Sequence, residues 1–146
     1  MKRSKIVPIR TAKVLTEVGG VIDESGVTLA VYGVNLNPNE VTDLLRVKPT
    51  RSFIRGYRRN LASRPAPHGA WFLEVRGKTP DGPDVQLRKL LMKLPTSENI
   101  WKELKARHKV QIRFGLHMTG WNKGFEISST LVRRLRKIGV DLEFDI

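Results

Sequence analysis

The stretch that decides the fold is Val27-Thr28-Leu29-Ala30-Val31-Tyr32-Gly33-Val34, followed by Asn37-Pro38-Asn39-Glu40. The first part is rich in apolar and β-branched residues, which is typical of a buried strand. In the second part, Asn37 is a favoured helix N-cap, Pro38 suits the first helical position, and Glu40 completes a capping-box pattern. A strand that leads directly into a helix is therefore the first unit of the predicted fold.

The remaining elements are predicted from the spacing of apolar residues along the chain. Spacings of three and four residues predict a short first helix that ends at Pro49, a helix after Pro83, a helix capped by Thr96 or Ser97, and a helix capped by Ser128 or Ser129 that ends at Gly139. Strands are predicted around 52–54, over 70–76, over 110–118 and over 140–146. The helix residues expected to face inward are Val41, Leu44, Leu45, Leu87, Leu90, Leu91, Leu94, Ile100, Trp101, Leu104, Leu131, Val132, Leu135 and Ile138.

The closing stretch, Val140-Asp141-Leu142-Glu143-Phe144-Asp145-Ile146, alternates apolar and acidic residues. Three carboxylates on one face of a strand are a candidate for metal binding or acid–base chemistry. Alternation alone accounts for them as the solvent face of a strand whose apolar residues point inward. We expect Arg113 and Arg76, on neighbouring strands, to neutralise them across the sheet.

The order of these elements predicts an α+β fold of one domain, with an antiparallel or mixed sheet and helices packed on one face. Two similar strand–helix units leave a duplicated ferredoxin-like arrangement open. The compact domain is expected over 27–146. Residues 1–26 read as a basic N-terminal extension, in which Val14-Leu15-Thr16-Glu17-Val18 is a candidate edge strand.

The length and composition set limits on function. A chain of 146 residues without cysteine matches one domain and excludes a disulfide framework, a thiolate zinc site and a cysteine nucleophile. No apolar run approaches the roughly 20 residues of a membrane span, and no apolar stretch of signal-peptide length follows the basic N-terminus. We therefore expect a cytoplasmic protein with no membrane association and no cofactor.

Charge is the unusual property of this sequence. Lys and Arg total 27 against 14 acidic residues, which gives a net charge of +13. Such a charge favours nucleic acid, another polyanion, an anionic membrane or an acidic protein face as a partner. The alternative is a merely solvated surface in an organism whose proteins are basic.

The strongest candidate site is an arginine-rich arm over 46–64, which has no acidic residue. Its basic residues are Arg46, Lys48, Arg51, Arg55, Arg58, Arg59 and Arg64. Arginine pairs with phosphate in a bidentate way, and the interleaved Phe53 and Tyr57 are aromatic side chains that can stack on a base. The alternative is that Phe53 and Ile54 anchor the arm to the core while its arginines are only solvated.

Other candidate residues carry weaker signals. Arg133, Arg134, Arg136 and Lys137 on the last helix, and Arg88, Lys89 and Lys93 on an earlier one, are expected to be the solvated faces of amphipathic helices. His68 and Trp121 are candidates for a cleft. His68, His108 and His117 show no metal-ligand spacing, so no metal site is expected. Phosphate-loop, dinucleotide-binding and hydrolase-elbow motifs do not occur, and we expect no enzymatic activity.

Four blocks of sequence resemble a known bacterial family. They are Leu29 to Leu45, the stretch Lys48-Pro49-Thr50-Arg51-Ser52-Phe53 with Gly56, the strand Gly69-Ala70-Trp71-Phe72-Leu73, and Gly124 to Ile146. In this order they resemble the family called domain of unknown function 4279, over about 27–146. The resemblance implies a fold and a bacterial or phage-like origin, and it implies no activity. The basic extension and the high positive charge depart from the family's usual pattern.

Two functions are consistent with these features. The first is a non-catalytic module that binds nucleic acid or another polyanion through the arm over 46–64. The second is a protein-interaction part, such as an immunity-like or assembly subunit, that docks an acidic protein partner. The sequence does not define the oligomeric state.

Overall fold

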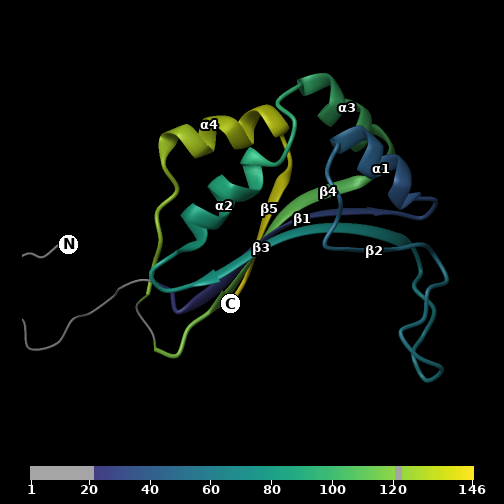
Figure 1. The fold of residues 1–146 in the computed structure, drawn as a ribbon, viewed down its shortest axis with the longest axis horizontal. Coiled ribbons are helices and arrows are strands. Elements are labelled where there is room, and N and C mark those ends of the chain that lie inside the picture. Colours follow the sequence, from purple (N-terminus) through teal and green to yellow (C-terminus); the bar gives the residue numbers. More distant parts are fainter. Residues whose placement is uncertain (1–21, 121–122) are drawn as a thin grey trace, which may run out of the picture.

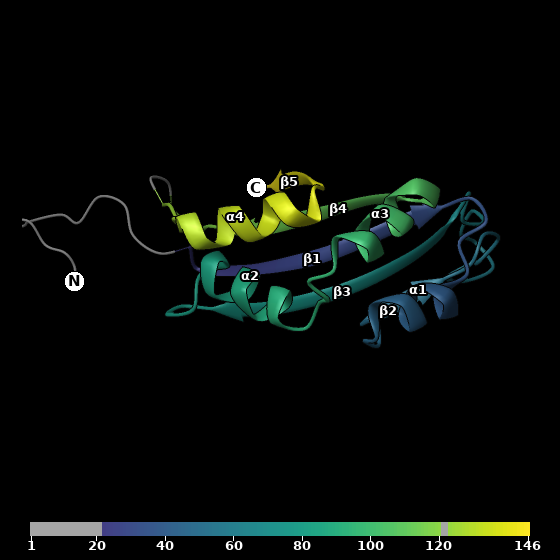
Figure 2. The same cartoon turned by 90° about the horizontal axis from the view of Figure 1, so that it is seen from above.

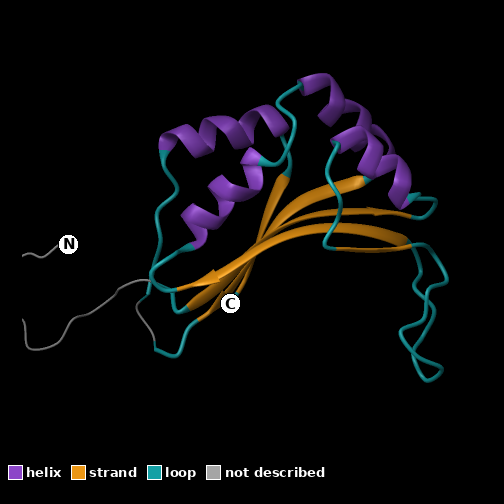
Figure 3. Ribbon diagram, viewed as in Figure 1, coloured by secondary structure: helices purple, strands orange, loops and turns teal. Residues whose placement is uncertain are grey.

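The chain folds around a five-stranded sheet with the strand order β2-β3-β1-β4-β5. The structure is a computed structural model, and it describes residues 22–120 and 123–146. The strands are β1 (Glu24–Gly33), β2 (Arg51–Phe53), β3 (Gly69–Lys78), β4 (Lys109–His117) and β5 (Asp141–Asp145). The helices are α1 (Pro38–Leu45), α2 (Pro83–Met92), α3 (Glu98–Arg107) and α4 (Ser129–Ile138). All four lie on one side of the sheet (Figures 1 and 3), which confirms the α+β prediction.

The topology is that of one ferredoxin-like unit with an added strand. Strand β1 pairs antiparallel with both β3 and β4, and β2 pairs antiparallel with β3. With α1 to α3 as crossovers, these four strands give the β-α-β-β-α-β pattern. Helix α4 then returns the chain so that β5 pairs parallel with β4, as a helical crossover permits. The described residues thus contain one such unit rather than a duplicated pair.

The helix-facing side of the sheet holds the core. Leu29 of β1 lies between Leu73 of β3 and Ile112 of β4, and all three are buried. The leucine stripe of α2 packs on this layer. Trp71 is also buried, and its Nε1 donates a 3.0 Å hydrogen bond to the hydroxyl of Thr42 on α1. Because burial of one leucine contributes roughly 1.5–3 kcal/mol, this layer holds the helices to the sheet.

Two of the three predicted N-caps make a side-chain hydrogen bond, whereas Ser97 precedes α3 without one. Asn37 precedes α1, and its side chain accepts a 3.0 Å hydrogen bond from the backbone N–H of Asn39. Of the two candidates for α4, Ser128 is the cap, and it accepts from the N–H of Leu131 over 3.3 Å. Gly139 ends α4 with a φ of 68°, in the left-handed region that glycine adopts without strain.

Three details differ from the sequence-based expectations. Strand β1 begins at Glu24 rather than at Val27. Val132, expected to face inward, is 53% exposed, because α4 turns Leu131 to the core and the next residue lies about 100° further round the helix. The apolar residues of β5 point to the helix side, but Phe144 is 47% exposed, since β5 is the sheet edge and lies beyond the helices (Figure 2).

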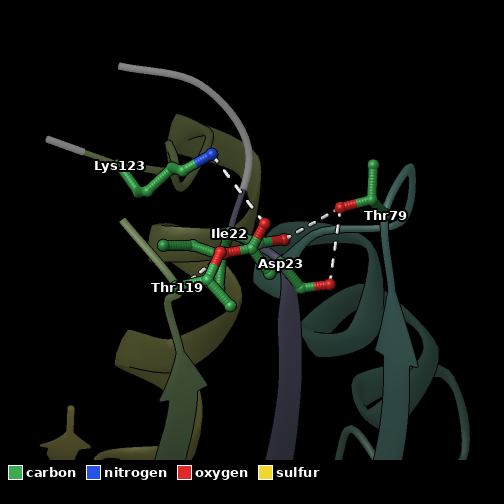
Figure 4. Close-up of polar contacts among 5 residues, drawn as sticks. All are labelled: Ile22, Asp23, Thr79, Thr119 and Lys123. Atoms are coloured by element: carbon green, nitrogen blue, oxygen red, sulfur yellow. Dashed lines mark hydrogen bonds and ion pairs between the residues drawn. The ribbon is translucent and has the colours of Figure 1, made fainter. Parts of the chain in front are cut away.

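The start of β1 is fixed by polar contacts with two other strand ends (Figure 4). One carboxylate oxygen of Asp23 accepts hydrogen bonds from the backbone N–H and the hydroxyl of Thr119, over 2.8 and 3.0 Å. Its other oxygen lies 3.8 Å from the ammonium of Lys123. The backbone N–H of Thr79 donates to the carbonyl of Asp23 over 3.0 Å. The candidate edge strand over 14–18 lies outside the described residues.

Candidate functional site

The side of the sheet without helices is the surface on which the candidate residues meet. Side chains alternate between the faces of a strand. Because Trp71 and Leu73 are buried on the helix side, Phe72 and Glu74 point to the opposite side. We call this side the open face; its outward side chains include Thr28, Tyr32, Arg51, Phe53, Phe72, Glu74, Arg76, Lys109, Gln111, Arg113 and Glu143.

Hollows follow the open face over much of its length. One is lined by Tyr32, His68, Lys109 and Gln111, and a second by Thr50, Arg51 and Phe72. A third lies toward the opposite end of the strands, beside Glu24, Arg76 and His117. Arg113 lines all three, so they form adjoining parts of one surface.

Five rings form a continuous row across the open face, which we call the aromatic strip. The ring centroids of His68 and Tyr32 are 5.4 Å apart, and those of Tyr32 and Phe72 are 5.6 Å apart. Phe72 is 6.2 Å from Phe53, which stacks on Tyr57 at 5.3 Å. Tyr32 and Phe53 both lie diagonal to Phe72 across neighbouring strands, where large side chains can meet. The strip therefore runs from the centre of the sheet to the arm.

Arg51 lies beside this strip. Its guanidinium carbon is 5.4 Å from the ring centroid of Phe53 and 5.3 Å from that of Phe72. At exposed sites such cation–π contacts contribute about 0.5–1 kcal/mol. The side chain is exposed, and no carboxylate of the described residues pairs with it. Arg51 thus combines a planar stacking surface with an unneutralised charge.

The part of the arm beyond β2 is a closed loop with internal hydrogen bonds. Ala66 accepts from the N–H of Gly56 over 2.8 Å and donates to the carbonyl of Tyr57 over 2.7 Å. At the tip, the side chain of Asn60 accepts from the N–H of Ala62 at 2.9 Å and from the hydroxyl of Ser63 at 3.0 Å. The loop projects from the sheet on the side away from the helices (Figure 1). These bonds give the arm a defined shape.

The arginines of this loop are exposed and not neutralised. Arg55, Arg58, Arg59 and Arg64 are all exposed, and none forms an ion pair with a residue that the structure describes. Arg58 donates to the carbonyl of Leu61 over 3.4 Å, which still leaves most of its donors unused. The loop therefore presents a concentration of positive charge next to the open face.

Two carboxylates elsewhere on the open face, Glu143 and Glu74, are paired with arginines. Glu143 accepts a 2.6 Å hydrogen bond from Arg113, which also donates to the hydroxyl of Tyr32 over 3.2 Å. Burial alone lowers the pKa of Arg113, but Tyr32 and Glu143 together raise it, so this guanidinium stays charged. Glu74 lies 3.9 Å from Arg76 on its own strand. Of the three β5 carboxylates, only Glu143 thus pairs with a described arginine across the sheet, and that arginine is Arg113 rather than Arg76.

The sequence model of a family described as Domain of unknown function (DUF4279) matches residues 23–146. The chain belongs to the DUF4279 family. The match spans every strand and helix from β1 to β5. Comparisons with curated proteins and with solved structures find no significant match.

Two of the basic residues expected in the arm lie elsewhere in the DUF4279 domain. Arg46 ends α1 with a φ of 58°, and its N–H donates to the carbonyl of Thr42 over 2.7 Å. Arg46 and Lys48 line a separate shallow hollow with Asp43. The structure therefore brings together on β2 and the loop only Arg51, Arg55, Arg58, Arg59 and Arg64, with Tyr57 beside them.

The helix-side basic residues of the DUF4279 domain lie across the sheet from the arm (Figure 1). Arg134 has a structural contact, because its guanidinium donates to the carbonyl of Leu91 at 2.8 Å, near the end of α2. Arg133, Arg136 and Lys137 are exposed. Positive charge thus occurs on both sides of the sheet, and only the arm side adjoins the aromatic strip.

The remaining candidates are histidines and Trp121. His68 lines a hollow of the open face, and its Nδ1 lies 3.2 Å from the carbonyl oxygen of Gly69. Trp121 lies outside the described residues. Within the described ranges, no three His, Asp or Glu side chains are placed to hold a metal ion. In the same ranges no helix has the length and apolar character that a membrane span requires.

Four residues of the open face were not predicted as parts of the site: Tyr32, Phe72, Lys109 and Arg113. A signal for Phe72 was present in the predicted strand over 70–76, because successive side chains of a strand point to opposite faces and Phe72 therefore points away from Trp71 and Leu73. One exposed aromatic residue is ordinary, but a contiguous row of such rings indicates a contact surface.

Proposed function

We propose that this domain is a non-catalytic module that binds nucleic acid, with the arm contacting the phosphate backbone. The observation that supports the proposal is the set of five exposed arginines on β2 and the loop, unpaired with any described carboxylate, beside an uncovered sheet face. They are Arg51, Arg55, Arg58, Arg59 and Arg64. Arginine forms bidentate hydrogen bonds with phosphate, and the loop holds several of them in one place.

The physical consequence is a binding free energy that depends on salt. Neutralisation of each phosphate releases condensed counterions. A plot of the logarithm of the affinity against the logarithm of the salt concentration therefore falls with a slope of about 0.7 to 0.9 for each contact. Three arginine–phosphate contacts would contribute a slope of about −2 to −3. Arginines already paired with carboxylates would contribute less, which is why the unpaired arm is central to the proposal.

The test compares two triple variants that remove the same charge from opposite sides of the sheet. The arm variant is Arg55→Gln/Arg58→Gln/Arg59→Gln, and the control is Arg133→Gln/Arg136→Gln/Lys137→Gln on α4. All six side chains are exposed, so both variants should fold. Binding of fluorescein-labelled 20-nucleotide oligomers is measured by anisotropy from 50 to 300 mM NaCl. We expect the arm variant to lose about tenfold or more in affinity, with a shallower salt slope, and the control to change less than about threefold.

The outcomes separate the proposal from its rivals. Equal losses in both variants would mean that net charge alone attracts the oligomers, and the arm would have no special role. Absence of binding by the wild type at 50 mM NaCl would overturn the proposal. A host protein that stays bound after nuclease treatment, together with no oligomer binding, would favour an acidic protein partner instead.

A further inference from the structure

We infer that the nucleic acid recognised here is single-stranded, with its bases stacked on the aromatic strip. This inference rests on the proposed function and adds the class of ligand. Its basis is the geometry of the strip: its rings lie between the phosphate-binding arm at one end and the hollows of the open face along its length.

The strip is accessible from the open side of the sheet. Tyr32, Phe53, Phe72 and His68 are each partly exposed, and Tyr57 at the arm end is 48% exposed. No helix of the described residues covers them, because all four helices lie on the other face (Figure 3). These rings thus contact one another and still present surface to a ligand.

Exposed rings favour a single strand over a duplex. In a duplex the base faces are stacked on one another, whereas an unpaired strand can turn its bases onto protein side chains. Stacking on an aromatic residue contributes about 1–3 kcal/mol per base, and it depends little on sequence. One common RNA-binding module uses aromatic residues on a four-stranded sheet in this way. Here Tyr32 and Phe72 lie on β1 and β3, the two inner strands of the four-stranded ferredoxin-like unit.

Arg51 connects the two parts of the surface. Its guanidinium already lies against Phe53 and Phe72, so it can stack beside a base and reach a phosphate at the same time. At the far end of the strip, Lys109 and Gln111 line the hollow that contains Tyr32 and His68. Lys109 is exposed and can contact a base edge or a further phosphate, whereas Gln111 is buried in the floor of the hollow. A single strand lying along the strip would thus have its backbone on the arm and its bases on the sheet.

The experiment separates stacking from phosphate contact. Labelled 20-nucleotide oligo(dT) and oligo(U), and a 20-base-pair DNA duplex, are titrated with wild type and with Phe72→Leu, which keeps an apolar side chain on the strand. Tyr57→Leu is the second stacking variant, since an exposed arm residue carries little folding risk. Phe144→Leu, a ring on the helix side of the edge strand, is the matched control. Thermal melting confirms that each variant is folded.

We expect the wild type to bind at least one single strand about tenfold tighter than the duplex. Each stacking variant should lose about fivefold or more for single strands, with duplex affinity within twofold of wild type, because stacking contributes about 1–3 kcal/mol per base. Phe144→Leu should leave both unchanged. Equal affinity for duplex and single strands, or no effect of either stacking variant, would overturn this inference while nucleic-acid binding itself stands. Failure to bind any of the three probes would overturn the proposed function as well.

Discussion

Arg113 Nε donates a 2.6 Å hydrogen bond to Glu143 Oε1, joining the middle of the open face to the edge strand. The pair matters for the electrostatics of the surface, because it offsets the charge of the one arginine that lines all three hollows. Arg51 has no such partner among the described carboxylates. The positive charge of the open face therefore concentrates at its arm end.

Release of Arg113 from this pair should strengthen anion binding. Glu143→Gln keeps a hydrogen-bond acceptor for Arg113 but removes a negative charge from the open face. We expect a two- to fivefold gain in oligonucleotide affinity at low salt that fades as salt rises, because exposed charges are screened. Stability should change by less than about 1 kcal/mol, as for other exposed pairs. Glu103→Gln removes a similar exposed pair on α3 and should leave affinity unchanged. An equal gain in both variants would contradict a local effect.

Asp23 makes stability depend on pH in acid. Hydrogen bonds from the backbone N–H and hydroxyl of Thr119, with Lys123 nearby, lower the pKa of the Asp23 carboxyl in the folded state. A lowered folded pKa means that this stabilisation is present above the unfolded pKa of about 3.9 and is lost as the pH falls through the folded pKa. Asp23→Asn should therefore be less stable than wild type at pH 7, with the difference shrinking toward pH 3. Urea unfolding at several pH values measures this.

Thr119→Val provides an internal check on the same contact. It removes the hydroxyl donor to Asp23 and keeps the backbone N–H. Its loss of stability at pH 7 should be smaller than that of Asp23→Asn, and it too should diminish in acid. A difference between Asp23→Asn and wild type that stays constant from pH 7 to pH 3 would show that the carboxylate charge is not what matters.

The sequence predicted the elements of this fold better than their exposure. Asn37, Ser128 and Gly139 marked helix ends correctly, because capping depends on local hydrogen bonds that a few adjacent residues determine. The alternation of apolar and acidic residues in β5 predicted that Phe144 points to the helix side. It did not predict that the side chain is 47% exposed. Exposure depends on which strand is the sheet edge and how far the helices reach, and both are set by contacts distant in sequence.

The arm and the aromatic strip also differed in how far the sequence alone predicted them. The arm arginines form a run in the sequence, so their accumulation was visible without the fold. The aromatic strip was not, because Tyr32 and Phe72 come from strands far apart in the chain and meet only through the β1–β3 register. Arg46 shows the limit of adjacency in sequence, which grouped it with the arm, whereas in the structure it ends α1.

Gly33 should not tolerate a side chain. A methyl group built at this position would overlap the ring of His108, at the end of α3. Overpacking of this kind costs about 1–3 kcal/mol, so Gly33→Ala should be destabilised by that amount. Gly115→Ala is the control, since the new methyl group would meet only the carbonyl oxygen of Gly26, 3.9 Å away. The double variant Gly33→Ala/His108→Ala should lose less than the sum of the single changes, because both act at one contact. Simple additivity in urea unfolding would place the cause elsewhere.

Arg134 is a basic residue that supports the fold, unlike the exposed basic residues that are available to a ligand. Its guanidinium donates to the carbonyls of Leu91 and Leu94, over 2.8 and 3.5 Å, and so ties α4 to the end of α2. Hydrogen bonds to charged groups contribute about 1.5–3 kcal/mol, and partial exposure of this one reduces the expected effect to about 1–2 kcal/mol. Arg134→Met, which keeps most of the apolar stem, should lower the free energy of unfolding by that amount. Arg136→Met, an exposed neighbour, should change it by less than about 0.5 kcal/mol.

At temperatures where both variants are folded, oligonucleotide affinity should equal that of the wild type, since neither residue lies on the arm side of the sheet. A large loss of affinity in folded Arg134→Met would instead make α4 part of the binding surface.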